Sequence, residues 1–308
     1  MAKRYLFLLL FLLITLSKCS PPTDRYGQLD DFDLQGHRGA MGMFAENTIP
    51  GFMIAIDQGV NTVEFDVVIS ADDEVVVSHE PWFRPSICLK PDGSEISEDE
   101  IDDHLIYQLT YDEISQYDCG SRQNPEFPDQ QNRAQPKPTM AQAIIAMEGY
   151  ISDQNLDKVN YSIEIKYQLE WENEKVPDPE TFARLVYEEL SELDILDRVI
   201  IQSFSPASLR AMRNLNEDIR QALLVSRNGG NVDEDINNLG YTPEIYSPHH
   251  MLVSSDLVRE AQEQGMTVVP WTVNDPEDMR NMLEMNVDGL ITDYPDRFNE
   301  YIRELLQE

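Results

Sequence analysis

The sequence predicts an α/β fold, a (β/α)8 barrel, and two observations lead to it. Apolar segments rich in β-branched residues alternate with amphipathic helical segments along most of the chain, and this strand-then-helix order is typical of a parallel sheet. Roughly eight such units fill the 308 residues, which fits a closed barrel better than an open doubly wound sheet. The open sheet stays as the alternative, because a sequence does not reveal strand closure.

The expected strands are short apolar runs, and the expected helices carry apolar residues at helical spacing. Most of these helices open on a Ser, Thr or Asp that can cap them. The expected strands are 34–37, 62–69, 75–79, 161–166, 199–204, 222–226, 245–247, 267–273 and 289–292. The expected helices are 48–58, 139–147, 178–193, 205–215, 254–264, 275–285 and 295–306.

Residues 81–137 interrupt this alternation with many charges and scattered Pro and Gly. One helical pattern, 109–117, stands out. We interpret the segment as an insertion after the second strand region, placed beside the barrel mouth. Cys88 and Cys119 both fall in it. In an oxidising compartment they would form a disulfide, and two unpaired buried thiols are the alternative.

Residues 1–20 have the pattern of an export signal. Two basic residues precede an apolar run over 5–16, which is short for a bilayer span. Cys19 follows in a context that resembles a bacterial lipoprotein signal, although Lys18 stands where a small residue is usual. Ordinary cleavage and a retained anchor are the alternatives. All versions predict an exported protein, periplasmic or tethered to the outer membrane as a lipoprotein, with residues 21–33 as a polar linker.

The charge balance excludes some partners. The chain has 23 Lys and Arg against 57 Asp and Glu, a formal net charge of −34. A nucleic-acid-binding protein would show a basic face, and adhesion to anionic lipid also needs positive charge. An anionic substrate therefore requires a site that is locally positive.

The expected strand 62–69 carries carboxylates where a plain core strand carries aliphatic side chains. Glu64 and Asp66 share one face of it, and both faces of a parallel strand are normally buried. Two buried carboxylates repel each other, and a divalent cation would neutralise both. A solvated edge-strand face is the alternative, which the apolar neighbours oppose. His37 and His79 each end a short apolar run nearby, where barrels place their working groups.

Taken together, these motifs resemble the glycerophosphodiester phosphodiesterase family. The matching pieces are His37-Arg38-Gly39, Glu46-Asn47-Thr48, Glu64-x-Asp66, His79-Glu80, Glu164-x-Lys166, Trp271 and the segment 288–295. Each piece alone is weak, but their order is specific. The resemblance covers residues 34–308. It implies a TIM barrel that hydrolyses glycerophosphodiesters to glycerol 3-phosphate and an alcohol with one divalent cation, Ca or Mg.

The resemblance also implies roles for individual residues. It assigns metal binding to Glu64, Asp66 and Glu164. It assigns acid–base catalysis to His37 and His79. The chemistry is consistent, because a bound cation offsets phosphoryl charge while one histidine takes a proton and the other gives one.

Three further residues are expected at the substrate. Arg38 resembles the phosphate clamp, since a guanidinium fork matches two phosphoryl oxygens. Lys166 shares a strand face with Glu164 and would add a second positive group, with a simple ion pair as the alternative. Trp271 would wall the glycerol pocket, with core packing as the alternative. The chain departs from the family at Glu80, where Asp is usual after the second histidine.

Three other functions stay open. A related phospholipase would act on intact lipid through a long apolar loop at the mouth, whereas 81–137 is polar and acidic. A non-catalytic surface binding protein on the same barrel would have lost one of the expected catalytic histidines or metal-binding carboxylates. The sequence retains both histidines and all three carboxylates. A different metal-dependent barrel hydrolase would gather more histidines than the five present. We interpret His249-His250 as part of a solvated loop.

Overall fold

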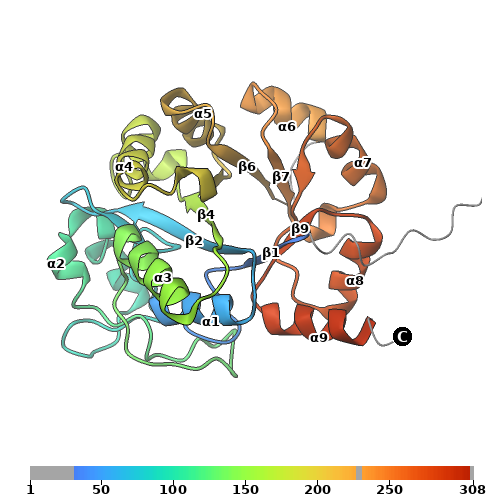
Figure 1. The fold of residues 1–308 in the computed structure, drawn as a ribbon. Helices are drawn as coiled ribbons and strands as arrows, with labels where there is room; N and C mark the ends of the chain where they lie inside the picture. The colour runs from blue at the N-terminus through green and yellow to red at the C-terminus, as the bar shows by residue number, and fades with distance from the viewer. Residues whose placement is uncertain (1–30, 227–230, 306–308) are drawn as a thin grey trace, which may run out of the picture. The chain divides into compact units, whose positions relative to one another are not determined.

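The computed structural model describes residues 31–226 and 231–305, and Figure 1 traces the chain. Eight parallel strands lie in the order β8-β7-β6-β5-β4-β2-β1-β9, with helices outside them. The barrel strands are β1 Asp33–Gly36, β2 Thr62–Ile69, β4 Asn160–Ile165, β5 Val199–Ser203, β6 Arg220–Val225, β7 Ile245–Pro248, β8 Thr267–Val268 and β9 Gly289–Thr292. The expected (β/α)8 barrel is therefore confirmed.

Backbone hydrogen bonds between the segments around β8 and β9 complete the ring. The Asp288 N–H donates to the Val268 carbonyl at 2.9 Å, and the Ile291 N–H donates to the Pro270 carbonyl at 2.9 Å. The Val273 N–H returns to the Ile291 carbonyl at 2.9 Å. On its other side β9 pairs with β1 in parallel. These bonds exclude the open doubly wound sheet.

Most helices begin where the sequence predicts. Side-chain oxygens of the expected caps accept a bond from the first turn, which leaves fewer backbone donors unpaired; they are Thr48, Thr139, Asp178, Ser205, Ser254 and Asp275. The helices around the barrel are α1 Ile49–Asp57, α3 Met140–Gln154, α4 Pro179–Glu192, α5 Pro206–Leu215, α6 Val232–Leu239, α7 Ser255–Glu263, α8 Pro276–Glu284 and α9 Pro295–Leu305.

Several elements differ from the sequence prediction. The expected helix 139–147 extends to Gln154, the expected strand 267–273 shortens to Thr267–Val268, and the expected helix 109–117 shortens to Tyr111–Ile114. Strand β3 (Val75–Val77) pairs antiparallel with β2, with Val76 opposite Val68. The expected strand 75–79 is thus shorter than predicted and is not one of the barrel strands. A run of valines favours a strand, but it does not indicate whether that strand pairs parallel or antiparallel. Helix α6 was not expected, since its sequence VDEDINNL has few apolar residues. Its cap is Asn231.

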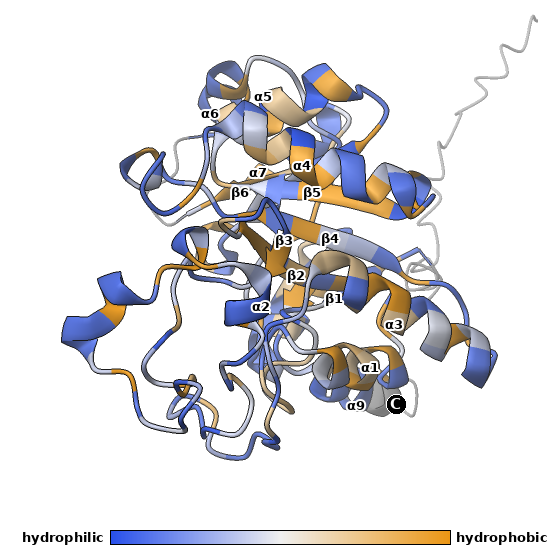
Figure 2. Cartoon of the chain, turned by 90° about the vertical axis from the view of Figure 1, so that its left-hand side faces the viewer, coloured by the Kyte–Doolittle hydropathy of each residue, from blue (hydrophilic) through white to orange (hydrophobic). Residues whose placement is uncertain are grey.

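Residues 81–137 form a loop-rich segment with 3-10 turns and one short helix, α2 (Tyr111–Ile114). Figure 2 shows the contrast in hydropathy, with β2, β3 and β5 largely orange and the loops beside α2 mostly blue or pale. A disulfide joins Cys88 to Cys119. Trp82 packs edge-on against Trp171 in the loop after β4, with ring centroids 5.7 Å apart. The segment therefore lies beside the carboxyl end of the barrel strands.

The expected signal segment 1–20, with Cys19, lies outside the described residues. The expected linker 21–33 ends earlier than predicted. Phe32 is buried and its ring stacks on Phe298 with centroids 5.2 Å apart, while Asp33 is the first residue of β1. Within 31–226 and 231–305, no helix is long and apolar enough to cross a membrane.

Candidate active site

Strand β2 is the base of the site, and its alternation decides what points inward. All eight of its residues are buried. Phe65 faces outward and packs against Phe52 of α1, with ring centroids 5.5 Å apart. Glu64 and Asp66 therefore point into the barrel interior, as alternation along a strand requires.

Glu164 on β4 joins this pair. Asp66 and Glu164 are register partners across the two strands, and each of the three carboxylates offers an oxygen within 4.8 Å of the other two. The exposed fractions of Glu64, Asp66 and Glu164 are 1%, 1% and 7%. The Gln202 side chain, from β5, donates to Glu64 Oε1 at 2.7 Å. We call the three acids the acidic cluster; within the described ranges it is the one such group found.

The acidic cluster fits a divalent metal ion. Burial and the neighbouring Asp66 charge raise the pKa of Glu64 to about 8. The pKa rises because the ionised form of Glu64 is poorly solvated and is repelled by a second carboxylate. Asp66 Oδ1 is buried with no hydrogen-bond partner. Lys166 offsets part of the charge, with Nζ 2.8 Å from Glu164 Oε1 and 3.7 Å from Asp66 Oδ1. An orphaned buried oxygen among three acids suits a hard cation.

His37 follows β1 and is paired with Asp293, which follows β9. The His37 Nδ1 to Asp293 Oδ1 distance is 2.5 Å, and Asn274 donates to the other carboxylate oxygen at 2.6 Å. Burial alone would lower the pKa of His37, but the Asp293 charge and hydrogen bond outweigh it and raise that pKa above its ordinary value. The pair favours a protonated ring.

His79 has a carboxylate partner of its own. Its Nδ1 lies 2.7 Å from Glu80 Oε1. Burial works against the Glu80 charge, but the His79 hydrogen bond and charge lower the pKa of Glu80 to about 2. The longer Glu side chain therefore still reaches the ring next to it, at a position where the family usually has Asp.

The backbone at Arg38 is strained. Arg38 has a φ of 48°, in the left-handed region that costs a non-Gly residue energy. Its N–H donates to Glu64 Oε2 at 2.7 Å. Its guanidinium donates to Glu46 Oε1 at 3.0 Å and lies 3.4 Å from Asp66 Oδ2. Asn47, with a φ of 54°, donates to the same Asp66 oxygen at 2.9 Å. Both strained residues thus orient the acidic cluster.

A pocket with a cavity volume of about 120 Å³, partly open to solvent, lies over these groups. Its apolar side includes Trp271 and Phe204, whose rings meet edge-on with centroids 5.3 Å apart. Trp271 Nε1 donates to the Ser247 carbonyl at 3.0 Å. The pocket is lined by His37, Arg38, Glu64, His79, Glu164, Lys166, Gln202, Phe204, Leu224, Trp271, Thr272 and Ile291. Trp271 both lines the pocket and packs against the barrel core.

His249 and His250 lie beside Trp271 rather than in the acidic cluster. Their rings stack with centroids 4.6 Å apart, and His249 also meets Trp271 edge-on. His250 Nε2 is 3.9 Å from Asp278. Both histidines thus make ring or charge contacts next to Trp271, and neither lines the pocket or belongs to the acidic cluster.

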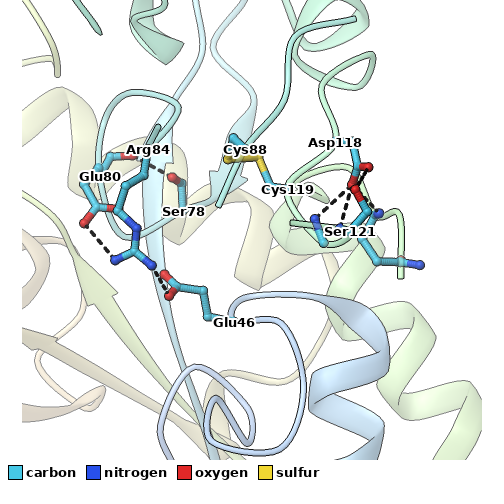
Figure 3. The surroundings of a disulfide bond; sticks show 10 residues. Glu46, Ser78, Glu80, Arg84, Cys88, Asp118, Cys119 and Ser121 are labelled. Carbon is cyan, nitrogen blue, oxygen red and sulfur yellow. Dashed lines mark hydrogen bonds and ion pairs between the residues drawn. A yellow bond between two sulfur atoms is a disulfide. The ribbon is translucent and has the colours of Figure 1, made fainter. Parts of the chain in front are cut away.

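Sequence reasoning gave no role to three residues of the site. Asp293 sits in the quoted segment 288–295 directly after β9, so its place at a strand end was the available signal. Gln202 is the next-to-last residue of β5, so it also lies near a strand end. Arg84 gave no signal, since 81–137 has no regular pattern; its Nη2 donates to Glu46 Oε2 at 2.6 Å (Figure 3).

Comparison with known proteins agrees with this geometry. The sequence model described as the glycerophosphoryl diester phosphodiesterase family matches residues 37–297. The chain belongs to this family. It is therefore a phosphodiesterase.

Relatives match this phosphodiesterase over most of its length. A glycerophosphodiester phosphodiesterase from Caldanaerobacter subterraneus is 27% identical over 269 residues, which is 87% of this chain and 96% of the relative. The crystal structure of a candidate glycerophosphoryl diester phosphodiesterase from Silicibacter pomeroyi is 27% identical, with a TM-score of 0.79 over 90% of this chain and 97% of that one.

A second structure shares the fold at lower identity. It is an Oleispira antarctica phosphodiesterase in complex with the product sn-glycerol-3-phosphate. Its identity is 22% and its TM-score 0.69, over 91% of this phosphodiesterase and 99% of that chain.

Proposed function

We propose that this phosphodiesterase hydrolyses glycerophosphodiesters to glycerol 3-phosphate and an alcohol, with His37 and His79 as the acid–base pair. One observation carries the proposal: two histidines line one pocket, and each is bonded through Nδ1 to its own carboxylate. Cleavage of a diester needs one proton removed from the attacking oxygen and one delivered to the leaving oxygen. Imidazole is the side chain suited to both transfers near neutral pH.

The paired carboxylates leave Nε2 of each ring for the substrate. One imidazole takes the proton of the attacking hydroxyl, supplied by water or by the glycerol itself. In the second case a cyclic phosphate forms first, and water then opens it to glycerol 3-phosphate by the same proton transfers. A phosphorus–oxygen bond forms to that oxygen, and the bond to the alcohol breaks. The other imidazole donates its proton to the leaving oxygen, so that a neutral alcohol departs.

Positive groups at the pocket would offset the repulsion between an anionic substrate and a protein with a formal net charge of −34. Arg38 and Lys166 would bind the non-bridging phosphoryl oxygens. Glu64, Asp66 and Glu164 would hold one divalent cation, Ca or Mg, which when bound offsets the charge that develops on the phosphoryl group. Trp271 would form the wall against which the glycerol carbons lie.

The test is release of glycerol 3-phosphate from glycerophosphocholine, with Ca, with Mg and with a chelator. We expect release that depends on metal and is lost in His37→Ala and in His79→Ala. His104→Ala is the matched control, because His104 bonds to Tyr117 in the 81–137 segment and does not line the pocket. A folded wild-type protein that releases nothing with either metal would contradict the proposal.

We also propose that the enzyme is exported and tethered to a membrane through a lipid on Cys19. The support is the sequence pattern of residues 1–20. In cells fed a labelled fatty acid, the wild type should carry the label and sediment with membranes. Cys19→Ala should lose both properties. Label that persists in Cys19→Ala would refute the tether.

A further inference from the structure

Two residues of the proposed mechanism are held by carboxylates that do not themselves line the pocket. Arg38 donates to Glu46 Oε1 at 3.0 Å. His79 bonds to Glu80 Oε1 at 2.7 Å. Neither Glu46 nor Glu80 is one of the pocket-lining residues, so each acts on the substrate only through its partner.

Arg84 lies between these two carboxylates. Its Nη2 donates to Glu46 Oε2 at 2.6 Å, and its Nη1 lies 3.7 Å from Glu80 Oε1, the same oxygen that pairs with His79 (Figure 3). One guanidinium thus spans the supports of Arg38 and of His79. The side chains of Arg84, Glu46 and Glu80 are 22%, 5% and 16% exposed, so solvent screens these contacts little.

The Arg84 fork also separates like charges. Without it, Glu46 and Glu80 would face each other with less counter-charge between them. Two other cations, Arg38 and Lys137, also lie close to both acids. Arg38 pairs with Glu46 but forms no ion pair with Glu80 within 4.0 Å among the described residues. Lys137 forms no ion pair within 4.0 Å in that same part of the chain and lies over the Phe83 ring, 6.0 Å from its centroid. A lysine has no planar fork to bind two carboxylates at once. The bridging function therefore belongs to Arg84.

The turn that carries Arg84 is fixed by the disulfide. The N–H groups of Ile87 and Cys88 both donate to the Arg84 carbonyl, at 3.1 and 3.0 Å. Cys88 is bonded to Cys119, and the Cys119 N–H donates to the Gln135 carbonyl at 2.8 Å. Cys88, Cys119 and Ile87 are buried in the small core of the 81–137 segment. Figure 3 shows the disulfide beside the Arg84 turn.

We propose that Arg84 is a positioning residue that fixes the phosphate clamp Arg38 and the proton-transferring His79 relative to each other, and that the Cys88–Cys119 disulfide holds the turn from which it reaches them. The inference rests on the proposed function for its kinetic consequences. Its structural content, a coupling of Arg84 to the His79 ring, stands apart from activity. Removal of the outer partners of metal ligands costs roughly 10–100-fold in activity, and we expect a loss of the same order here.

The first experiment compares Arg84→Met and Arg84→Lys in the full chain with Arg122→Met as the matched control. Arg122 lies in the same segment and lines a crevice with Glu46, but it pairs with Glu95 at 3.3 Å and forms no ion pair with Glu46 or Glu80 within 4.0 Å among the described residues. With glycerophosphocholine we expect kcat to fall roughly 10–100-fold in Arg84→Met, to recover partly in Arg84→Lys, and to stay at the wild-type value in Arg122→Met.

A kcat in Arg84→Met equal to that of Arg122→Met would overturn the proposal. The double variant Arg84→Met/Glu80→Gln is compared with the two single variants. Losses of kcat that simply add in the double variant would also overturn the proposal, because residues that act through one another give non-additive effects. The disulfide is tested by Cys88→Ser/Cys119→Ser, which should lower kcat in the wild type and add little in Arg84→Met. Full activity of the double-serine variant would overturn the part assigned to the disulfide.

A readout without turnover separates this inference from the proposed function. Correlation spectra of the 15N-labelled histidine rings should show the His79 resonances displaced in Arg84→Met and unmoved in Arg122→Met. If the wild type does not cleave glycerophosphocholine, the proposed function is refuted. The spectra would still test whether Arg84 positions the His79 ring. His79 resonances that do not move in a folded Arg84→Met protein would refute the positioning, whether or not the wild type is active.

Discussion

Replacing Asp293 with Asn removes one charge from the partner of His37 and keeps the size of the side chain. The two groups are 2.5 Å apart, and their side chains are 15% and 5% exposed. Hydrogen bonds to charged groups contribute about 1.5–3 kcal/mol. At about 1.4 kcal/mol for each pKa unit, the pKa of His37 should fall by roughly 1–2 units.

The same loss should reduce turnover, because the protonated ring is no longer stabilised by a carboxylate. The expected fall in kcat is roughly 10–100-fold at the same energies. The assay is the pH profile of kcat/KM on glycerophosphocholine, together with an NMR titration of the His37 ring. Asn274→Ala is the control, since it removes the bond to the other Asp293 oxygen but leaves the charge.

Stability should respond with a definite sign. The pKa of His37 is raised above its ordinary 6.5 in the folded state, so the pair stabilises the protein below that pH, and this is lost as pH rises through the folded value. Asp293→Asn should therefore lower the free energy of unfolding more at about pH 6 than at about pH 9 in urea titrations. An unchanged His37 titration, or a loss no larger than that of Asn274→Ala, would refute the reasoning.

Three further predictions concern other parts of the molecule. Asp66→Asn should weaken binding of Ca or Mg at least about tenfold in isothermal titration calorimetry, because it removes one acid of the cluster; equal affinity would contradict the metal assignment. Burial raises the pKa of Glu189 to about 7, so Glu189→Gln should raise the Tm at about pH 8 and barely change it at about pH 4. A larger rise in Tm at about pH 4 than at about pH 8, measured by calorimetry, would contradict this prediction. Phe65→Ala should cost about 3–5 kcal/mol in urea unfolding, since Phe65 is fully buried against Phe52; a cost near zero would show that the ring is not packed as described.

Much of the fold follows from local pattern. The alternation of apolar strands with capped helices predicted the barrel because both signals depend on a few neighbouring residues. Strand direction does not depend on them, so the sequence did not reveal that β3 pairs antiparallel with β2 outside the barrel order. Helix α6 was missed for a related reason: its sequence is short and acidic, and packing against the barrel stabilises it more than its own pattern does.

Residue spacing alone predicted only the part of the site that lies on strands, and the roles of the other site residues came from the family resemblance. Glu64 and Asp66 share a face by the geometry of one strand, and that is readable from spacing. The bond from His37 to Asp293 joins positions 256 residues apart, and only barrel closure brings them together. Arg84 contacts Glu46 across the irregular 81–137 segment, where no periodicity fixes a side-chain direction.

The order in which a ribosome makes the chain has an effect here, because the first and last barrel strands are neighbours. A nascent chain that has reached Met285 already contains both histidines and all three acids of the cluster. It lacks β9, so β1 has an unpaired edge and His37 has no Asp293. The His37–Asp293 pair is therefore completed last. If His37 has the role proposed for it, a chain that lacks the C-terminal strand should not turn over substrate.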